Sequence, residues 1–288
     1  DRDNVDRRWD WVQSILSGEP DCISAPGDIG HDAFERTWQR TDKPVLDGQI
    51  ARTWMWGPTP HTCAFYEPYV ESPGGMRLVQ YFDKSRMEIT HPDADSDSIW
   101  YVTNGLLVVE LISGRRQMGD NTFEQFEPAE VNVAGDADDP TGPTYASFKD
   151  LLDVTAGMQL DAIRSVIHRD GSVTVEDSYA DFGIGTAIFV EETQHWIATP
   201  FWNFMNSSGL VYEDGELTSA PLFVNPYYAT GYPITDPYWA TVKVAGTPRA
   251  VLTQCFERRC LTYTPGNPPG FATEAGNVGQ HYYTWRYS

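Results

Sequence analysis

The sequence predicts a β-rich α+β fold of two related lobes, each a sheet that contains a β-hairpin and is accompanied by short helices. The first observation is that residues 78–89, LVQYFDKSRMEI, align without a gap with residues 252–263, LTQCFERRCLTY. The second is that the likeness continues at the same offset, which indicates an internal duplication covering roughly residues 77–111 and 251–285. The third is that the order helix, turn, hairpin and closing aromatic segment occurs twice along the chain.

The second copy of the repeat predicts the register of its hairpin. If Cys255 faces Cys260 across a four-residue turn, the two-residue period of strands fixes the partner of every neighbour. The more apolar face of this hairpin then carries Leu252, Gln254, Leu261 and Tyr263. In the first copy the same face carries Leu78, Gln80, Met87 and Ile89, and the pair in place of the cysteines is Tyr81 and Arg86. A helix would scatter these residues around its axis, so the pattern predicts hairpins packed on a core.

Each hairpin directs one glutamine toward the core. These residues are Gln80 and Gln254. A buried amide without partners costs about 1–3 kcal/mol, so we expect each side chain to bond to the backbone of a neighbouring loop. The glutamines are therefore interpreted as structural residues.

The four cysteines favour two disulfides. Cys255 and Cys260 would be opposed residues of an antiparallel pair, and Cys22 and Cys63 lie in loop-like surroundings. In the chain-entropy model the short link contributes about 2 kcal/mol and the long link about 4 kcal/mol. A reduced or redox-active pair is the alternative, although the sequence has no CxxC spacing. Two disulfides predict an oxidising compartment and hence a secreted, extracellular or cell-surface protein.

The composition limits the partners of the protein. A net charge of -21 with a pI near 4.5 repels phosphate backbones and anionic lipids, so we expect neither nucleic-acid binding nor membrane insertion. The longest apolar run, residues 105–112, is interrupted by Glu110 and is too short to span a bilayer. Ten Trp, 15 Tyr and 13 Phe exceed the need of an ordinary core, so some aromatic rings should lie on the surface.

The first part of the chain predicts two helices and a strand. A helix over residues 5–16 would be an N-terminal brace of the first lobe, and a second helix over residues 32–39 places Phe34 and Trp38 one turn apart. Residues 50–56 alternate like a strand that projects two tryptophans from one face. These are Trp54 and Trp56, and buried packing and a sugar-stacking surface are both open for them.

Two loops of the first lobe carry candidate binding residues. The loop before the first hairpin is rich in proline and aromatic residues, including Tyr66 and Tyr69, which is typical of an ordered Ω-like loop. The loop after it alternates Asp93, Asp95 and Asp97, as the first side-chain ligands of a calcium loop do. The rest of the calcium pattern is absent, so a structural calcium ion and a solvated acidic turn are both open.

The remaining chain predicts the domain boundaries. A helix is expected to open near Thr103 and to end before Gly114, and residues 128–143 have the composition of a linker. We therefore expect a first lobe, a connecting segment and a second lobe. They would span residues 1–130, 131–198 and 199–288. The elements expected after the linker are a short helix at 144–153, a hairpin at 162–175, a helix that starts at Pro200 and an alternating aromatic strand at 282–287.

The chain resembles an uncharacterised group of secreted bacterial proteins. The residues that carry the resemblance are FERRCLTYTP at 256–265 and GNVGQHYYTWRY at 276–287, together with YFDKSRMEI at 81–89. The segment GYPITD at 231–236, followed by the hairpin, is similar to LGFP-type repeats of cell-wall proteins. These resemblances imply an extracellular setting.

The preferred function is non-catalytic binding of a glycan or cell-envelope polymer through surface aromatic residues. The candidate binding residues are Trp54, Trp56, Tyr66, Tyr69, Trp100 and Tyr101. A structural subunit of an extracellular layer or filament, formed by self-assembly, is the first alternative. A glycoside hydrolase that uses paired carboxylates is the second.

The hydrolase hypothesis rests on charged residues of the two hairpins. Its candidates are Asp83, Arg86, Glu88 and Glu257. The competing interpretation is a salt bridge within each turn, from Asp83 to Lys84 or Arg86 and from Glu257 to Arg258 or Arg259. The sequence has no HExxH, GxSxG, Walker or dinucleotide-binding motif that would favour another enzyme class.

Overall fold

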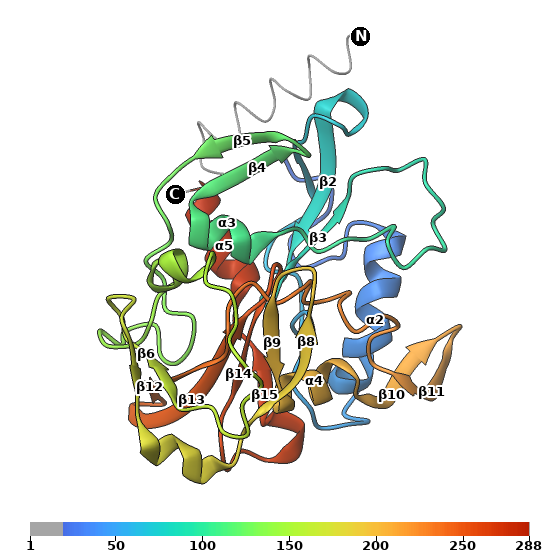
Figure 1. Ribbon diagram of the computed structural model, residues 1–288. Coiled ribbons are helices and arrows are strands. Elements are labelled where there is room, and N and C mark those ends of the chain that lie inside the picture. Colours follow the sequence, from blue (N-terminus) through green and yellow to red (C-terminus); the bar gives the residue numbers. More distant parts are fainter. Residues whose placement is uncertain (1–19, 288) are drawn as a thin grey trace.

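The computed structural model describes residues 20–287 (Figure 1). Their strands form five sheets, of six, three, two, two and two strands, and only short helices accompany them. The predicted β-rich fold with short helices is therefore confirmed. The helix expected at residues 5–16 lies outside the described residues.

The elements follow one another along the chain as short units. The helices are α2 (Asp32–Leu46), α3 (Leu107–Ser113), α4 (Thr199–Met205) and α5 (Val278–Tyr287), with 3-10 turns η1 (Pro73–Gly75), η2 (Tyr145–Leu151), η3 (Asp177–Phe182) and η4 (Pro269–Phe271). The strands of the first part are β1 (Phe65–Pro68), β2 (Met76–Tyr81), β3 (Arg86–Ile89), β4 (Arg115–Gly119) and β5 (Thr122–Gln125). The later strands are β6 (Ser165–Ile167), β7 (Val173–Val175), β8 (Thr186–Val190), β9 (His195–Ala198), β10 (Ser208–Glu213), β11 (Glu216–Pro221), β12 (Tyr238–Val244), β13 (Thr247–Cys255), β14 (Cys260–Tyr263) and β15 (Thr273–Ala275).

Both predicted hairpins have the expected register. In the second, Cys255 faces Cys260 and Gln254 faces Leu261. In the first, Tyr81 faces Arg86, and its other pairs also match the prediction. The hairpins therefore share one geometry, while their origin in a duplication stays a prediction.

The two core-facing glutamines make matching sets of hydrogen bonds. Gln80 Nε2 donates to the carbonyls of Asp28 and Thr62, and its Oε1 accepts from Gly30 N at 3.0 Å. In the second hairpin, Gln254 Nε2 donates to two carbonyls and its Oε1 accepts from a backbone N–H. The partner residues are Trp196, Thr235 and Ala198. The predicted structural role of both amides is confirmed, because each one ties two loops to a hairpin.

Each hairpin turn also binds the start of a helix from the opposite half of the chain. The carbonyl of Asp83 accepts from Gly279 N of α5 at 3.1 Å, and the carbonyl of Glu257 accepts from Val108 N of α3 at 3.2 Å. A Cβ on Gly279 would lie 1.9 Å from the carbonyl of Phe82, so only glycine permits this approach. The helices α3 and α5 lie side by side near the centre of the molecule (Figure 1).

The largest sheet joins segments that the sequence assigns to different regions. Its order is β15-β14-β13-β12-β6-β7, so the hairpin of β6 and β7 from the expected connecting segment extends the sheet of the second half. The link is parallel, with Trp239 paired to Val166. The α5 helix in turn packs on β2 and α3 of the first half. The halves are thus interwoven in space.

Two expected strands are wrong. Residues 50–56 form irregular backbone, in which Trp56 is buried and Trp54 is half-buried, so the two rings do not share a strand face. Residues 282–287 belong to the α5 helix. The alternating aromatic residues suggested a strand, but the residues that α5 buries follow a helical spacing: Val278 and Gly279, then Tyr282, then Arg286.

Other boundaries differ in detail. The α2 helix starts at Asp32 as expected and continues to Leu46, past the predicted end, with Pro44 in its last turn. The helix expected near Thr103 starts at Leu107 and ends at Gly114, which adopts a left-handed conformation with φ 72°. The hairpin at 162–175 and the helix that contains Pro200 are confirmed.

Both predicted disulfides are formed. Cys22 bonds to Cys63 and Cys255 bonds to Cys260, and the described residues contain no free cysteine. The first link fastens the loop before α2 to the strand region of β1. The second crosses the base of the turn in the β13–β14 hairpin.

The glutamine contacts yield a stability prediction. Replacing Gln254 by Leu leaves two buried carbonyls and one N–H without their partner, so the free energy of unfolding should fall by about 2–4 kcal/mol. Urea denaturation measures this loss. The control is Gln159→Leu, because that side chain is exposed and its change should stay within about 0.5 kcal/mol. Equal effects of the two substitutions would contradict the structural role.

Candidate functional site

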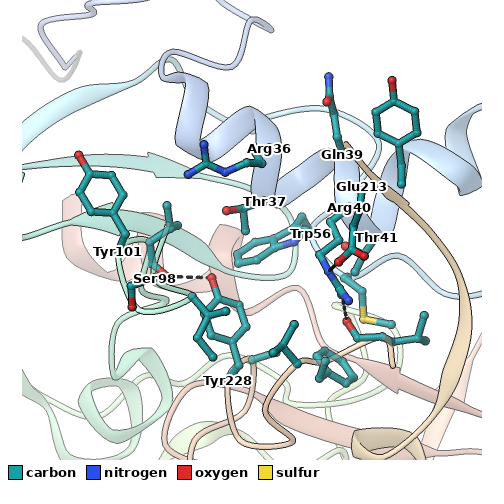
Figure 2. Close-up of a pocket in the computed structure, with 18 of the residues that line it drawn as sticks. Arg36, Thr37, Gln39, Arg40, Thr41, Trp56, Ser98, Tyr101, Glu213 and Tyr228 are labelled. Carbon is teal, nitrogen blue, oxygen red and sulfur yellow. Dashed lines mark hydrogen bonds and ion pairs between the residues drawn. The ribbon is translucent and has the colours of Figure 1, made fainter. Parts of the chain in front are cut away.

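A pocket with a volume of about 690 Å³ lies beside α2 (Figure 2). We call it the α2 pocket. One wall is α2 itself, and the others come from the loop at 96–102, the β10–β11 turn and the loop at 222–229. The principal polar and aromatic residues of the lining are Arg36, Thr37, Gln39, Arg40, Trp56, Asp97, Ser98, Tyr101, Tyr212, Glu213, Asp214, Tyr228 and Arg259. Residues far apart in the sequence thus meet in one concave surface.

Aromatic rings line the α2 pocket on several sides. Trp56 is 2% exposed and lies near the centre of the view in Figure 2, with Tyr228 below it and Tyr101 at the left. The hydroxyl of Tyr228 donates to the carbonyl of Val102 at 2.8 Å, which fixes its ring. Burial raises the pKa of Tyr228 to about 12, so this hydroxyl stays neutral and can donate.

Two arginines of α2 stand one helical turn apart at the pocket. Arg40 forms an ion pair with Glu213 at 2.6 Å and also donates to the carbonyl of Leu222. Its guanidinium group is therefore occupied by contacts within the pocket wall. Arg36 is exposed and donates to the carbonyl of Ser96 at 2.6 Å. The latter bond fastens the acidic loop to α2 and leaves a cationic group at the rim.

A third arginine enters the pocket from the turn of the second hairpin. Arg259 is only 1% exposed, lies with its guanidinium carbon 5.0 Å from the ring centroid of Trp56, and lines the cavity. It donates to the carbonyl of Met55 and to Asn104 Oδ1, but its Nε has no partner. No carboxylate within residues 20–287 forms an ion pair with Arg259. Burial lowers the pKa of the guanidinium to about 10, so it remains charged at neutral pH.

The structure brings together only some of the predicted binding aromatics. Trp56 and Tyr101 line the α2 pocket. Trp100 is 46% exposed and packs against the ring of Tyr228 at a centroid distance of 5.7 Å, so it extends the aromatic surface beyond the rim. The half-buried Trp54 does not line the pocket.

Two predicted binding tyrosines lie elsewhere. Tyr69 is buried, donates to Asp120 Oδ1 at 2.6 Å and covers the guanidinium of Arg77. Tyr66 on β1 packs against an apolar cluster to which both halves of the chain contribute. The structure thus places neither ring in the cavity.

The acidic loop forms a wall of the α2 pocket. Asp93, Asp95 and Asp97 are exposed, and Asp95 Oδ1 accepts from the backbone N–H of Asp97 at 3.0 Å. Across the described part of the chain, no three His, Cys, Asp or Glu side chains are grouped so that they could hold a metal ion. Only Asp97 faces the pocket. A calcium ion at this loop stays a prediction.

The predicted catalytic residues of the first hairpin lie in a buried ion network. Glu67 on β1 contacts Arg77 at 2.8 Å, Arg86 at 3.0 Å and Arg286 at 3.2 Å. Glu88 contacts Arg86 at 2.7 Å and Arg77 at 3.3 Å. All five side chains are at most 7% exposed. Arg86 and Glu88 are thus occupied by ion pairs, and neither side chain lines the α2 pocket.

The network shifts the ionisation of its carboxyl groups in opposite directions. Burial by itself would raise the pKa of Glu67, but the guanidinium groups of Arg286 and Arg86, with a third from β2, hold it well below its ordinary value. Burial raises the pKa of Glu110, which accepts a hydrogen bond from Tyr282. Glu67 is thus the ionised centre of the network.

The acidic residues of the two turns have structural contacts. Asp83 accepts from Gln280 Nε2 at 2.6 Å, and Glu257 accepts from the backbone N–H of Tyr232 at 3.0 Å. The predicted salt bridges within the turns are wrong for the described residues. Lys84 instead donates to the carbonyl of Ala275.

A second, more polar cavity of about 520 Å³ lies beside β13 to β15. Its lining includes Lys84, Glu130, Glu274 and His281. Burial lowers the pKa of His281 to about 4, and its Nδ1 is 3.0 Å from the hydroxyl of Tyr145. Because this histidine is neutral and already hydrogen-bonded, the cavity has weaker binding chemistry than the α2 pocket.

Sequence reasoning missed most of the α2 pocket. Arg36 and Arg40 at a spacing of four residues on the expected helix were a usable signal for a cationic face. Tyr228 and Arg259 had no such signal, because they reach the pocket only through the packing of the two halves.

Comparison of the chain with protein-family models, with curated proteins and with solved structures finds no match. The resemblance to secreted bacterial proteins and to LGFP-type repeats therefore stays a prediction. Within residues 20–287, no helix has both the length and the apolar character that crossing a bilayer requires. The site must accordingly be interpreted from its own geometry.

The ion network yields a test of its charges. Glu67→Gln removes the anion that three guanidinium groups share, so the free energy of unfolding at pH 7 should fall by about 3–5 kcal/mol. Glu110→Gln is the matched control, because burial already favours the neutral form of that carboxyl group. Thermal and urea denaturation measure both losses. A loss for Glu110→Gln as large as that for Glu67→Gln would refute this assignment.

The same network predicts a pH dependence of stability. The pKa of Glu67 in the folded protein lies below its ordinary value of 4.5, so its contribution is complete above pH 4.5 and disappears as the pH falls through the folded value. As the pH decreases below 4.5, the thermal unfolding midpoint of the wild type should therefore decrease more steeply than that of Glu67→Gln. Parallel curves for the two proteins between pH 4.5 and 3 would show that Glu67 does not cause the loss.

Proposed function

We propose that this protein is secreted and binds a glycan or a cell-envelope polymer in the α2 pocket. The observation that carries the proposal is the meeting of Trp56, Tyr101 and Tyr228 with arginine side chains in one cavity. Aromatic faces pack against the C–H surfaces of sugar rings, and guanidinium, hydroxyl and carboxylate groups bond to sugar hydroxyls. No catalytic group is needed for this role.

The shape of the pocket supports an extended ligand. A volume of about 690 Å³ lies within the range of small-molecule sites, which is about 300–1,000 Å³. Exposed Trp100 continues the aromatic surface from Tyr228 past the rim, so a chain of sugars could leave the cavity along it. Two formed disulfides are consistent with an oxidising, extracellular setting.

The two alternatives have less support. For the glycoside hydrolase, Arg86 and Glu88 are paired within the ion network and do not line the α2 pocket. For the structural subunit, no described surface singles out a contact between copies. Binding therefore remains the preferred proposal.

A binding measurement tests the proposal. On an array of bacterial envelope polysaccharides, the wild type should retain at least one polymer, and Tyr101→Ala should weaken that binding by about tenfold through the lost ring contact. Phe123→Ala is the matched control, because Phe123 is an exposed aromatic residue outside the pocket. Equal binding by the three proteins, or no retained polymer, would count against the α2 pocket.

A further inference from the structure

We propose that the ligand of the α2 pocket carries an oxyanion, and that Arg259 binds this group at the inner end of the cavity. The inference rests on the proposed function and adds the chemical class of the ligand. The oxyanion is the carboxylate of an acidic sugar or the phosphate of a sugar-phosphate polymer. Both offer the paired oxygens that a guanidinium group binds.

The first argument is the unsatisfied state of Arg259. A guanidinium group has five N–H donors, and in Arg259 the described bonds use one on Nη1 and one on Nη2. The Nε–H is buried without a partner. Leaving a buried donor unpaired costs free energy, so the guanidinium group keeps unused hydrogen-bonding capacity beside the cavity that Arg259 lines.

The second argument is the charge of this group. Arg77 and Arg86, which are equally buried, each contact two glutamates. Arg259 has no such contact. The carboxylate that most favours the charged form of Arg259 is Asp42. It accepts hydrogen bonds from the backbone N–H groups of Met55, Trp56 and Gly57. A buried cation in a chain of net charge -21 is therefore left without a direct anionic partner, and it borders the cavity.

The third argument is that the structure holds Arg259 in place before any ligand arrives. Its backbone carbonyl accepts from Phe256 N at 2.9 Å, and the disulfide to Cys260 closes the same turn. The ring of Trp56 covers its guanidinium group. An arginine fixed in this way loses little conformational entropy when it binds an oxyanion.

The rim of the pocket moderates this attraction. Arg36 adds positive charge, while exposed Asp97 adds negative charge. Removal of the Asp97 charge should therefore strengthen the binding of an anion and leave a neutral ligand unaffected.

The experiment measures dissociation constants by calorimetry for four probes. They are a neutral N-acetylglucosamine tetramer, an oligogalacturonate, an oligomer of glycerol phosphate and inorganic phosphate. The wild type should bind one of the two anionic oligomers at least tenfold more tightly than the neutral one, and which one it prefers distinguishes the carboxylate from the phosphate source. Arg259→Gln should reduce that preference to about one, and Arg259→Lys, which keeps the charge but loses the planar fork, should give an intermediate value.

Circular dichroism shows whether the Arg259 variants are folded. If they are not, a substitution at the rim of the pocket tests the inference instead. Asp97→Asn should tighten binding of the preferred anionic probe about twofold. Asp153→Asn, an exposed acid outside the pocket, is the charge-matched control and should change nothing.

The outcomes separate this inference from the proposed function. If wild type and Arg259 variants bind neutral and anionic oligosaccharides alike, the oxyanion inference is overturned and glycan binding stands. If no oligosaccharide binds while inorganic phosphate binds in an Arg259-dependent manner, the oxyanion site stands and the glycan proposal fails. Absence of all binding overturns both.

Discussion

The buried carboxylate of Glu67 is the interaction on which the arrangement of this protein depends. Three guanidinium groups, from β2, β3 and α5, converge on its two oxygens, and the hydroxyl of Tyr287 adds a fourth donor. Charges in a low-dielectric interior are stable only when each finds its partners, so strands and helix must meet in one geometry. That geometry places α5 over the turn of the first hairpin and beside α3.

Local patterns in the sequence predicted the hairpins well. The two-residue alternation fixed the facing residues, and the inward position of Gln80 and Gln254 then required backbone partners, which the structure supplies. The register itself started from the assumption that Cys255 faces Cys260, and the disulfide between them confirms it. These features depend on neighbours in the chain, so a pattern of a dozen residues contains the information.

Features that depend on distant residues could not be predicted in this way. Arg86 and Glu88 were considered as catalytic candidates, because the sequence did not show that Arg86 pairs with Glu67 of β1, which Arg286 of α5 also contacts. The aromatic alternation near Tyr282 resembled a strand, whereas the hairpin turn at Asp83 selects a helix by accepting its first N–H groups. Tertiary contacts decided each of these cases.

The α2 pocket shows the same limit for the candidate site. Trp56 and Tyr101 were expected among the binding residues, but the sequence did not indicate that Arg259 would join them. Its position follows from the packing of the second hairpin against the backbone at Met55. The chemistry of the cavity thus arises between the halves, where neither half alone could supply it.

Each hairpin turn binds the first residues of a helix from the other half, and this arrangement has a consequence for folding. Because Asp83 binds the start of α5 and Glu257 binds the start of α3, neither half satisfies its own helix. A fragment containing one half would leave amide groups of a helix and a turn carbonyl without partners.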